Sequence, residues 1–224
     1  MIGEDFKEIY KDIGRPYVRL NMDGTQSPVE YGKGILNSQA TKPFTVLTTV
    51  RGFFPHDTVV RPGDVIHFLD EDSYYMVTVL KASVLEGAIK FFSGVLYMVN
   101  SLAFMSREVN GQRDERGDLI QGFVQQTQKI HCNLSDTMFG TTLLEDGRIA
   151  IGDVTRDNQT LYLPAPWVKH RDSGEQLFVE IGDRLHVEPL KPETCWEAKD
   201  YEVIGVRRNR YDNVHDLTLR EDRR

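Results

Sequence analysis

Short stretches in which apolar and polar residues alternate, separated by turn-forming residues, recur along most of this 224-residue chain. Alternation with a period of two is typical of β-strands that bury one face, whereas helices need apolar residues three and four positions apart. The turns at 61–64 (RPGD) and 70–73 (DEDS) combine residues that favour tight reversals. The pattern predicts strands at 17–20, 44–54, 58–60, 65–69, 74–80, 89–92, 95–104, 119–130, 141–144, 148–151 and 160–163.

Short strands at this spacing favour an antiparallel β-barrel or sandwich over alternating β-α units, so the predicted fold class is mainly β. One short α-helix is expected at the N-terminus, on an apolar face formed by Phe6, Ile9, Tyr10 and Ile13. Acidic residues in its first turn complement the helix dipole, and a glycine and a proline follow its end. Because a helix of about ten residues is marginal by itself, we expect it to pack on the β-structure.

A long polar segment separates two strand-like arms between Arg107 and Asp118. Apart from Val109, this segment contains no large apolar residue. It is therefore predicted to form the tip of a long protruding hairpin. Such a tip can reach a neighbouring subunit or line a channel, and its candidate inter-subunit or channel residues are Asn110, Gln112, Arg113, Asp114 and Arg116.

Two stretches of the chain are similar to one another. Residues 62–68 (PGDVIHF) are echoed by residues 181–187 (IGDRLHV), and a strand of the same pattern follows each. A Gly-Asp turn that enters a strand and returns as an antiparallel partner would explain the echo, although unrelated hairpins can share it. The repeat suggests two β-modules with a boundary between about 131 and 150. The predicted organisation is a helix and extended arm at 1–40, a first β-module with the long hairpin at 41–135 and a second at 136–224.

Acidic residues outnumber basic ones by 34 to 27, which gives a formal net charge of −7. Proteins that bind duplex DNA tightly neutralise its phosphates with basic side chains, so this balance argues against tight DNA binding. It is compatible with a surface along which DNA slides. The N-terminal segment lacks the apolar core of a signal peptide, and the most apolar stretch, 91–105, is too short to span a membrane. We therefore expect a soluble protein with no membrane partner.

Familiar catalytic and cofactor signatures are absent from the sequence. It contains no phosphate-binding loop, nucleophile elbow or zinc-protease motif, and no glycine cluster fits dinucleotide binding. No two histidines lie three or four residues apart, and Cys132 and Cys195 form no metal-type pair. Three carboxylates at 70–72 could hold a hard cation, but the turn lacks the ligand spacing of a calcium loop. The sequence thus predicts no enzyme, no cofactor and no metal site.

Two further features could contact a partner protein. Trp167 follows two prolines that force an extended backbone, so it could anchor a partner or simply pack at the end of a barrel. The last 18 residues carry six arginines and four acids, with Arg207, Arg208 and Arg210 clustered. These arginines could meet phosphate or an acidic neighbouring subunit, or they could remain solvated.

Four segments in the C-terminal third carry a resemblance to a known family: 160–164 (TLYLP), 181–185 (IGDRL), 201–206 (YEVIGV) and 217–220 (LTLR). This part of the chain resembles the neck proteins of tailed bacteriophages, and most closely their small β-barrel head-closure, or stopper, group. In that group a strand ending in a similar "lyvp" segment precedes a "v-G-D-r-v" turn and a "Y-e-V" strand. The match covers under a third of the chain, which departs from the usual stopper by having a second β region before residue 130.

Membership would imply a ring of subunits under the portal, an axial channel that passes DNA without specific binding, and no catalytic centre. The expected partners are further copies of the chain, portal or adaptor proteins, and tail-terminator or tail-tube proteins, in a virion assembled in the host cytoplasm. Three alternatives remain. One is a tail-tip or baseplate component. Another is an oligonucleotide-binding β-barrel, which the acidic charge and the lack of an aromatic-basic stripe disfavour. The last is an enzyme with scattered catalytic acids.

Overall fold

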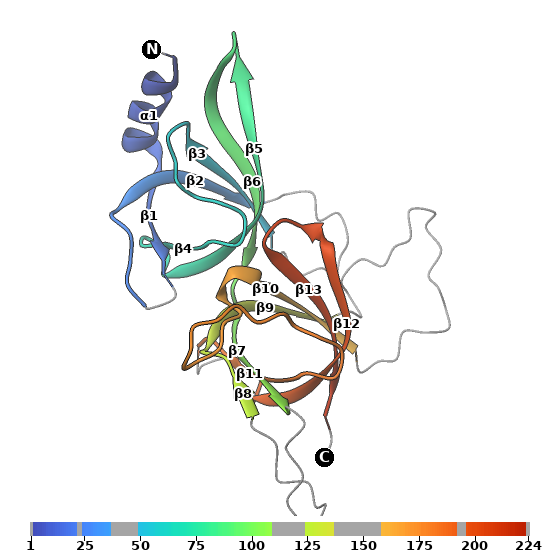
Figure 1. The fold of residues 1–224 in the computed structure, drawn as a ribbon. Coiled ribbons are helices and arrows are strands. Elements are labelled where there is room, and N and C mark those ends of the chain that lie inside the picture. Colours follow the sequence, from blue (N-terminus) through green and yellow to red (C-terminus); the bar gives the residue numbers. More distant parts are fainter. Residues whose placement is uncertain are drawn as a thin grey trace, which may run out of the picture. The chain divides into compact units, whose positions relative to one another are not determined.

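The computed structural model describes residues 2–21, 24–36, 49–108, 124–136, 158–191 and 196–222. Within them the chain is mainly antiparallel β-structure with a short N-terminal helix, which confirms the predicted fold class (Figure 1). The elements are α1 (Ile2–Ile13), β1 (Arg15–Leu20), β2 (Glu30–Leu36), β3 (Thr49–Pro55), β4 (Val65–Phe68), β5 (Ser73–Leu85), β6 (Ala88–Met98), β7 (Ser101–Glu108), β8 (Val124–Gln126), β9 (Ile130–Asp136), β10 (Asn158–Pro164), η1 (Ala165–Trp167), β11 (Arg184–Pro189), β12 (Lys199–Tyr211) and β13 (Val214–Glu221).

Helix α1 packs against β2, β3 and β6, as expected for a helix too short to be stable alone. Tyr10 is buried, and the Gly14 N–H donates to its carbonyl oxygen at 2.9 Å where the helix ends. Ile9 and Ile13 belong to the same predicted apolar face but are 46% and 63% exposed, so the barrel covers that face only in part. Neither helical segment in the described ranges is long and apolar enough to cross a membrane.

Six strands close the N-terminal barrel in the order β1-β2-β3-β6-β5-β4, and β4 pairs back onto β1. Three aromatic side chains lie at its centre with no exposed surface. The Tyr17 ring meets Phe54 and Phe68 edge to face, with ring centroids 5.5 and 6.0 Å apart. This is the arrangement that aromatic charge distributions favour, and burying each such side chain contributes about 1.5–3 kcal/mol.

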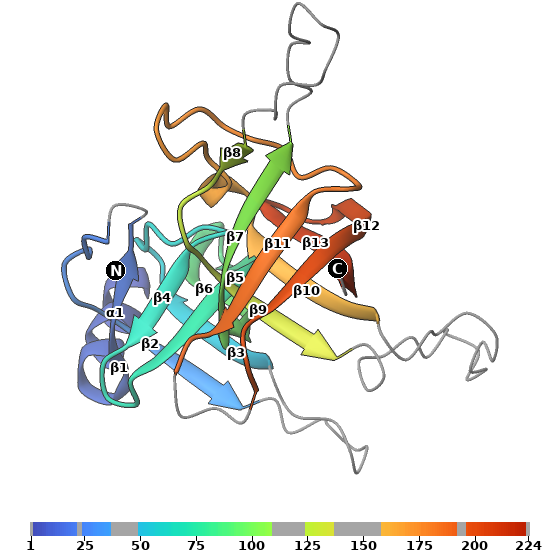
Figure 2. The same ribbon diagram turned by 90° about the horizontal axis from the view of Figure 1, so that it is seen from below.

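The C-terminal barrel closes in the order β7-β9-β10-β13-β12-β11, and β11 pairs back onto β7. Figure 2 shows β7, β11 and β12 side by side. On the other edge of β7, the first half pairs with β9 and the second half with the short strand β8. The buried core includes Met105, Ile130, Leu161, Leu185 and Leu217.

The two barrels have the same topology. When the six barrel strands of each are numbered along the chain, both barrels close in the order 1-2-3-6-5-4, and β8 is the additional strand among the described residues. A Gly-Asp turn precedes the fourth strand in both barrels, and both fifth strands, β5 and β12, have 13 residues. The sequence repeat therefore occupies equivalent positions in two equivalent barrels.

The junction between the barrels lies at Val99 and Asn100, earlier than the predicted boundary at 135–136. By contacts between residues, one compact unit holds Met1–Val99 with Asn209–Val214, and the other holds Asn100–Arg208 with His215–Arg224. The Val99 N–H donates to Tyr74, whereas the Asn100 N–H donates to Cys132 in the other barrel. The mostly apolar pattern at 95–104 predicts one strand there, but this stretch spans the end of β6 and the start of β7.

Other differences from the expected strands have local causes. Residues 58–60 form no strand, because the Thr58 hydroxyl and the buried Val60 hold them in a loop against the barrel. Strands β2, β9 and β13 were not predicted. Strands β7 and β8 pair around Arg107 and Gln125, but the tip of the predicted protruding hairpin lies outside the described residues, so this hairpin stays a prediction. The strands expected at 141–144 and 148–151 also lie outside them.

Candidate functional site

The Gly-Asp turn of the N-terminal barrel, residues 61–64, is held by four backbone and side-chain hydrogen bonds. The Asp64 N–H donates to the Arg61 carbonyl at 3.1 Å, and the Arg61 N–H donates to Asp64 Oδ2 at 2.8 Å. Two bonds join the turn to β5: Gly63 N–H to the Val77 carbonyl at 2.7 Å, and Val77 N–H to the Asp64 carbonyl at 2.9 Å. Gly63 has φ 91°, a left-handed conformation that side chains disfavour.

The Gly-Asp turn of the C-terminal barrel, residues 180–183, reproduces all four bonds. The Asp183 N–H donates to the Glu180 carbonyl at 3.2 Å, and the Glu180 N–H donates to Asp183 Oδ2 at 2.7 Å. Gly182 N–H donates to the Val203 carbonyl at 2.8 Å, and Val203 N–H returns a bond to Asp183 at 2.8 Å. Gly182 has φ 96°. The two turns are therefore the same structure built from different side chains.

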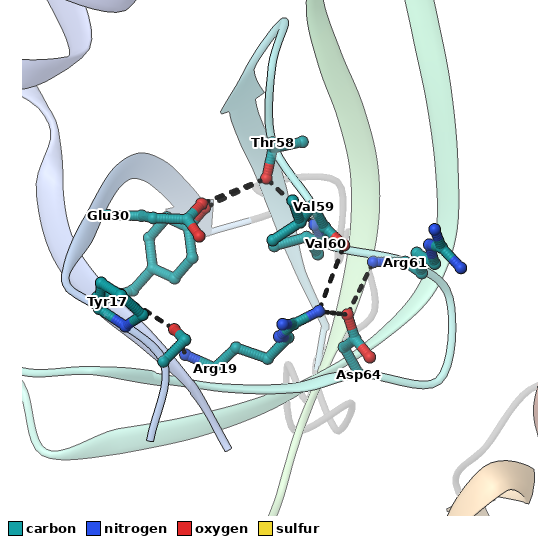
Figure 3. Close-up of polar contacts among 10 residues, drawn as sticks. Tyr17, Arg19, Glu30, Thr58, Val59, Val60, Arg61 and Asp64 are labelled. Carbon is teal, nitrogen blue, oxygen red and sulfur yellow. Dashed lines mark hydrogen bonds and ion pairs between the residues drawn. The ribbon is translucent and has the colours of Figure 1, made fainter. Parts of the chain in front are cut away.

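An arginine on the first strand of each barrel lies against the aspartate of its turn. Arg107 on β7 donates to both carboxylate oxygens of Asp183, at 2.6 and 2.7 Å, and to the Phe178 carbonyl at 2.5 Å. Arg19 on β1 lies 3.6 Å from Asp64 and donates to the Val59 carbonyl at 3.4 Å (Figure 3). The C-terminal ion pair is thus a two-point hydrogen-bonded contact, whereas the N-terminal one is looser.

Burial separates the two aspartates as well. The Asp183 side chain is 3% exposed and the Asp64 side chain 23%. Burial raises the pKa of the Asp64 carboxyl above its usual value, against the attraction of the nearby arginine. The hydrogen bond from Arg107 to Asp183 raises the pKa of that guanidinium, so Arg107 stays positively charged. Both aspartates hold their turns in place.

A polar network joins the loop before the first turn to the barrel interior (Figure 3). The buried Tyr17 hydroxyl donates to Glu30 Oε2 at 2.6 Å and lies 3.3 Å from Thr58 Oγ1. The Val60 N–H donates to Thr58 Oγ1 at 3.3 Å. Burial, followed by the bond to Glu30, raises the pKa of Tyr17, so the phenol stays neutral and acts as a hydrogen-bond donor.

The turns present apolar side chains to solvent. Phe178 and Ile181 are 58% and 71% exposed at the C-terminal turn, and Val59 is 51% exposed at the N-terminal one. A hollow of about 430 Å³ lies beside the C-terminal turn and is lined by Ser106, Arg107 and residues 180–184. Because hydrogen bonds fix the backbone that carries these side chains, a partner could bind them with little loss of conformational freedom. This surface suits protein contact.

The described residues bear on two kinds of catalytic group, a metal-binding cluster and a reactive thiol. They hold no group of three or more histidine, cysteine or acidic side chains placed to bind a metal ion. Burial raises the pKa of the Cys132 thiol, which disfavours the reactive thiolate.

The residues singled out from the sequence lie in different parts of the chain, and the structure describes only some of them. Trp167 is 8% exposed and lies with its ring edge to His131, 5.7 Å between centroids, which corresponds to the packing alternative. Arg207 is exposed on β12, which also contains Arg208 and Arg210. The candidate channel residues, from Asn110 to Arg116, lie outside the described residues.

Arg19 and Arg107 were missed by sequence reasoning. Arg19 belongs to an alternating strand pattern that predicts only an outward side chain. Arg107 begins the polar segment predicted as a hairpin tip, and it lies 76 residues from the aspartate it binds. The sequence repeat could have indicated that a basic partner exists, because the carboxylate of each Gly-Asp turn needs a hydrogen-bond or ion-pair partner.

Comparisons with known proteins assign the chain to no family. No protein-family model and no curated protein sequence matches the chain. Among solved structures, K. pneumonia MrkH in its apo state is 10% identical, with a TM-score of 0.20, over 99% of this chain and 83% of the other. A likeness at that score carries no argument about fold or function.

Proposed function

We propose that the protein is a non-enzymatic structural component of a tailed-bacteriophage neck. In this proposal it forms a ring of identical subunits at the head–tail junction, contacts the portal on one side and tail proteins on the other, and lets DNA pass. One observation carries the proposal. The four segments that resemble head-closure proteins lie on β10 to β13 and the turn before β11, and these strands are adjacent in one barrel in the order β11-β12-β13-β10.

The N-terminal barrel supports the same function. It repeats the topology and the Gly-Asp turn of the barrel that carries the resemblance, including all four bonds of that turn. The second β region, which makes the chain longer than a usual stopper, is thus a second barrel of the same kind. A two-barrel subunit can contact two neighbours of a stacked assembly, which suits a connector.

The charge of the chain fits a conduit for DNA. With 34 acidic against 27 basic residues, the average surface repels phosphate, so DNA would move past it without being held. Arg19 and Arg107 each form an ion pair with an aspartate of the same chain, so their charges are already partly neutralised.

The test is assembly of the purified full-length chain. We expect rings in negative-stain images and co-sedimentation with purified portal rings of the same phage. Phe178→Ser with Ile181→Ser should weaken that binding, and Leu69→Ser, which alters a 41%-exposed leucine of the N-terminal barrel, is the control. Binding to baseplate proteins but not to the portal would favour the tail-tip alternative. Salt-sensitive binding to single-stranded DNA by monomers would refute the neck.

The predicted channel loop has a separate test. Deleting residues 110–117 should impair DNA retention or the joining of head to tail. Intact infectious particles assembled from the deleted chain would count against a gating or inter-subunit role for Asn110, Gln112, Arg113, Asp114 and Arg116.

A further inference from the structure

The β5–β6 hairpin extends beyond the other strands of the N-terminal barrel (Figure 1). Strand β4 pairs with β5 only between Ser73 and Met76, and β3 pairs with β6 only as far as Phe91. We call residues 79–91 the arm. Its turn is formed by Glu86 and Gly87, whose φ values of 53° and 79° are those of the tight turn that matches the twist of a hairpin.

One edge of the arm is open. Along residues 79–85, β5 pairs with β6 on one side, and no strand in the described part of the chain pairs with its other side. The two register shifts of this hairpin skip Thr78 on β5 and Lys90 on β6, so the shift between Ser83 and Val84 places its extra residue on β6 and not on the open edge. It also contains no proline and a single charge, Lys81. Natural proteins use bulges, prolines and charges to prevent strand addition, and this edge has almost none of them.

Several side chains of the arm are exposed to solvent. Val84 is 59% exposed and Leu85 is 41% exposed, and Ile89, which lies opposite Val84 on β6, is 40% exposed. Leu80 differs because it packs partly on the barrel core. A strand with an unpaired edge and exposed apolar side chains on both faces is stabilised most by another strand of similar character.

We propose that this strand is the same edge of a second copy, paired antiparallel about a twofold axis at Ala82. The register follows from the edge itself. Centring on residue 82 pairs all seven residues 79–85 with one another, whereas centring on Lys81 places two lysines directly opposite and centring on residue 83 or 84 runs into the turn.

Side chains match in this register. Val79 lies opposite Leu85 of the other copy, Leu80 opposite Val84, Lys81 opposite Ser83, and Ala82 opposite Ala82. Each exposed apolar residue of the edge thus covers an apolar residue, and no like charges are directly opposite. The contact is isologous and closes at two copies, whereas a ring needs heterologous contacts, so the inference is independent of the proposed neck function.

A cysteine placed on the axis reports the pairing directly. Ala82 side chains of the two copies would have Cβ atoms about 4.5–5.5 Å apart, close enough for a disulfide after small adjustment. In a Cys195→Ser background, where the remaining Cys132 is buried, Ala82→Cys should form a covalent dimer under mild oxidation. Val95→Cys is the matched control, because Val95 is 38% exposed on β6, away from the open edge. Absence of the Ala82→Cys dimer, or equal dimer from both variants, would overturn the proposal.

Sedimentation of the unmodified chain provides a second measurement. We expect a concentration-dependent dimer, and Val84→Lys should weaken it on the order of tenfold or more, while Leu69→Lys should not. Circular dichroism confirms that both variants fold. A monomer at all concentrations would refute the arm pairing. A dimer whose affinity is unchanged by Val84→Lys would refute it as well. Rings without an Ala82→Cys crosslink would refute the arm pairing and leave the neck proposal standing.

Discussion

Replacing the same aspartate in the two barrels should have unequal consequences. Asp183 accepts two bonds from Arg107 and one from the Glu180 N–H, and its side chain is 3% exposed. Asp183→Ala leaves the guanidinium, itself 22% exposed, without its main partner. Removing one member of a buried ion pair costs about 3–5 kcal/mol. Asp64→Ala loses one N–H bond and a 3.6 Å ion pair, so it should cost about 1–2 kcal/mol.

The two tryptophans make the comparison measurable within one chain. Both Trp167 and Trp196 belong to the C-terminal unit, so tryptophan fluorescence reports its unfolding alone, while circular dichroism reports both barrels. With a urea slope of about 2 kcal/mol/M, Asp183→Ala should lower the fluorescence midpoint by about 2 M. Asp64→Ala should leave that midpoint unchanged. If Asp183→Ala prevents folding, Asp183→Asn, which keeps the shape and removes the charge, serves in its place.

Equal losses of stability from Asp183→Ala and Asp64→Ala would refute this reasoning. A loss below about 1 kcal/mol at Asp183 would mean that the two-point contact with Arg107 is offset by its desolvation. A shift of the fluorescence midpoint by Asp64→Ala would mean that the barrels do not unfold separately.

Two further predictions concern the turns and the pH dependence of stability. Gly182→Ala should lower the stability of the C-terminal barrel by about 1–2 kcal/mol, measured by tryptophan fluorescence in urea. The φ of Gly182 is 96° and an added Cβ meets no atom within 4 Å, so the cost comes from the backbone conformation alone. An unchanged stability would show that the backbone there relaxes freely. The hydrogen bond from Arg15 lowers the pKa of Asp70 below its usual 3.8. The ion pair between Arg15 and Asp70 therefore stabilises the fold above pH 3.8, and this stabilisation is lost as pH falls through the lower pKa of Asp70 in the folded state. The wild type should therefore exceed Asp70→Asn in melting temperature at pH 7, with the difference narrowing in acid, and a constant difference would contradict this assignment.

The sequence predicted what depends on local chemistry. The alternation of strand residues and the two Gly-Asp turns gave the mainly β class, and the repeat at 62–68 and 181–187 marked equivalent positions of two barrels. The junction at Val99 and Asn100 was not predicted, because Asn100 and Ser101 are the only polar residues in the pattern of 95–104, and such a pair also occurs within a strand.

The side-chain contacts of the site were equally inaccessible. Which arginine reaches Asp183 depends on β7 pairing with β11, and sequence spacing does not encode a pairing between strands so far apart. Trp167 shows the same limit, since the sequence left open whether it anchors a partner or packs at a barrel end, and only the fold places it almost buried against His131. Contacts fixed by tertiary pairing need the fold before they can be assigned.

The junction at Val99 and Asn100 also determines how the protein can be divided. Two neighbouring residues donate their N–H groups to different barrels, so the chain passes from one hydrogen-bonded network to the other across a single peptide bond. A protease requires several residues of unbonded, extended chain, and this crossing offers none. A truncated gene cut between these two residues keeps both backbone bonds, whereas a cut on either side would remove one of them; the N-terminal piece would still lack Asn209–Val214, which group with it.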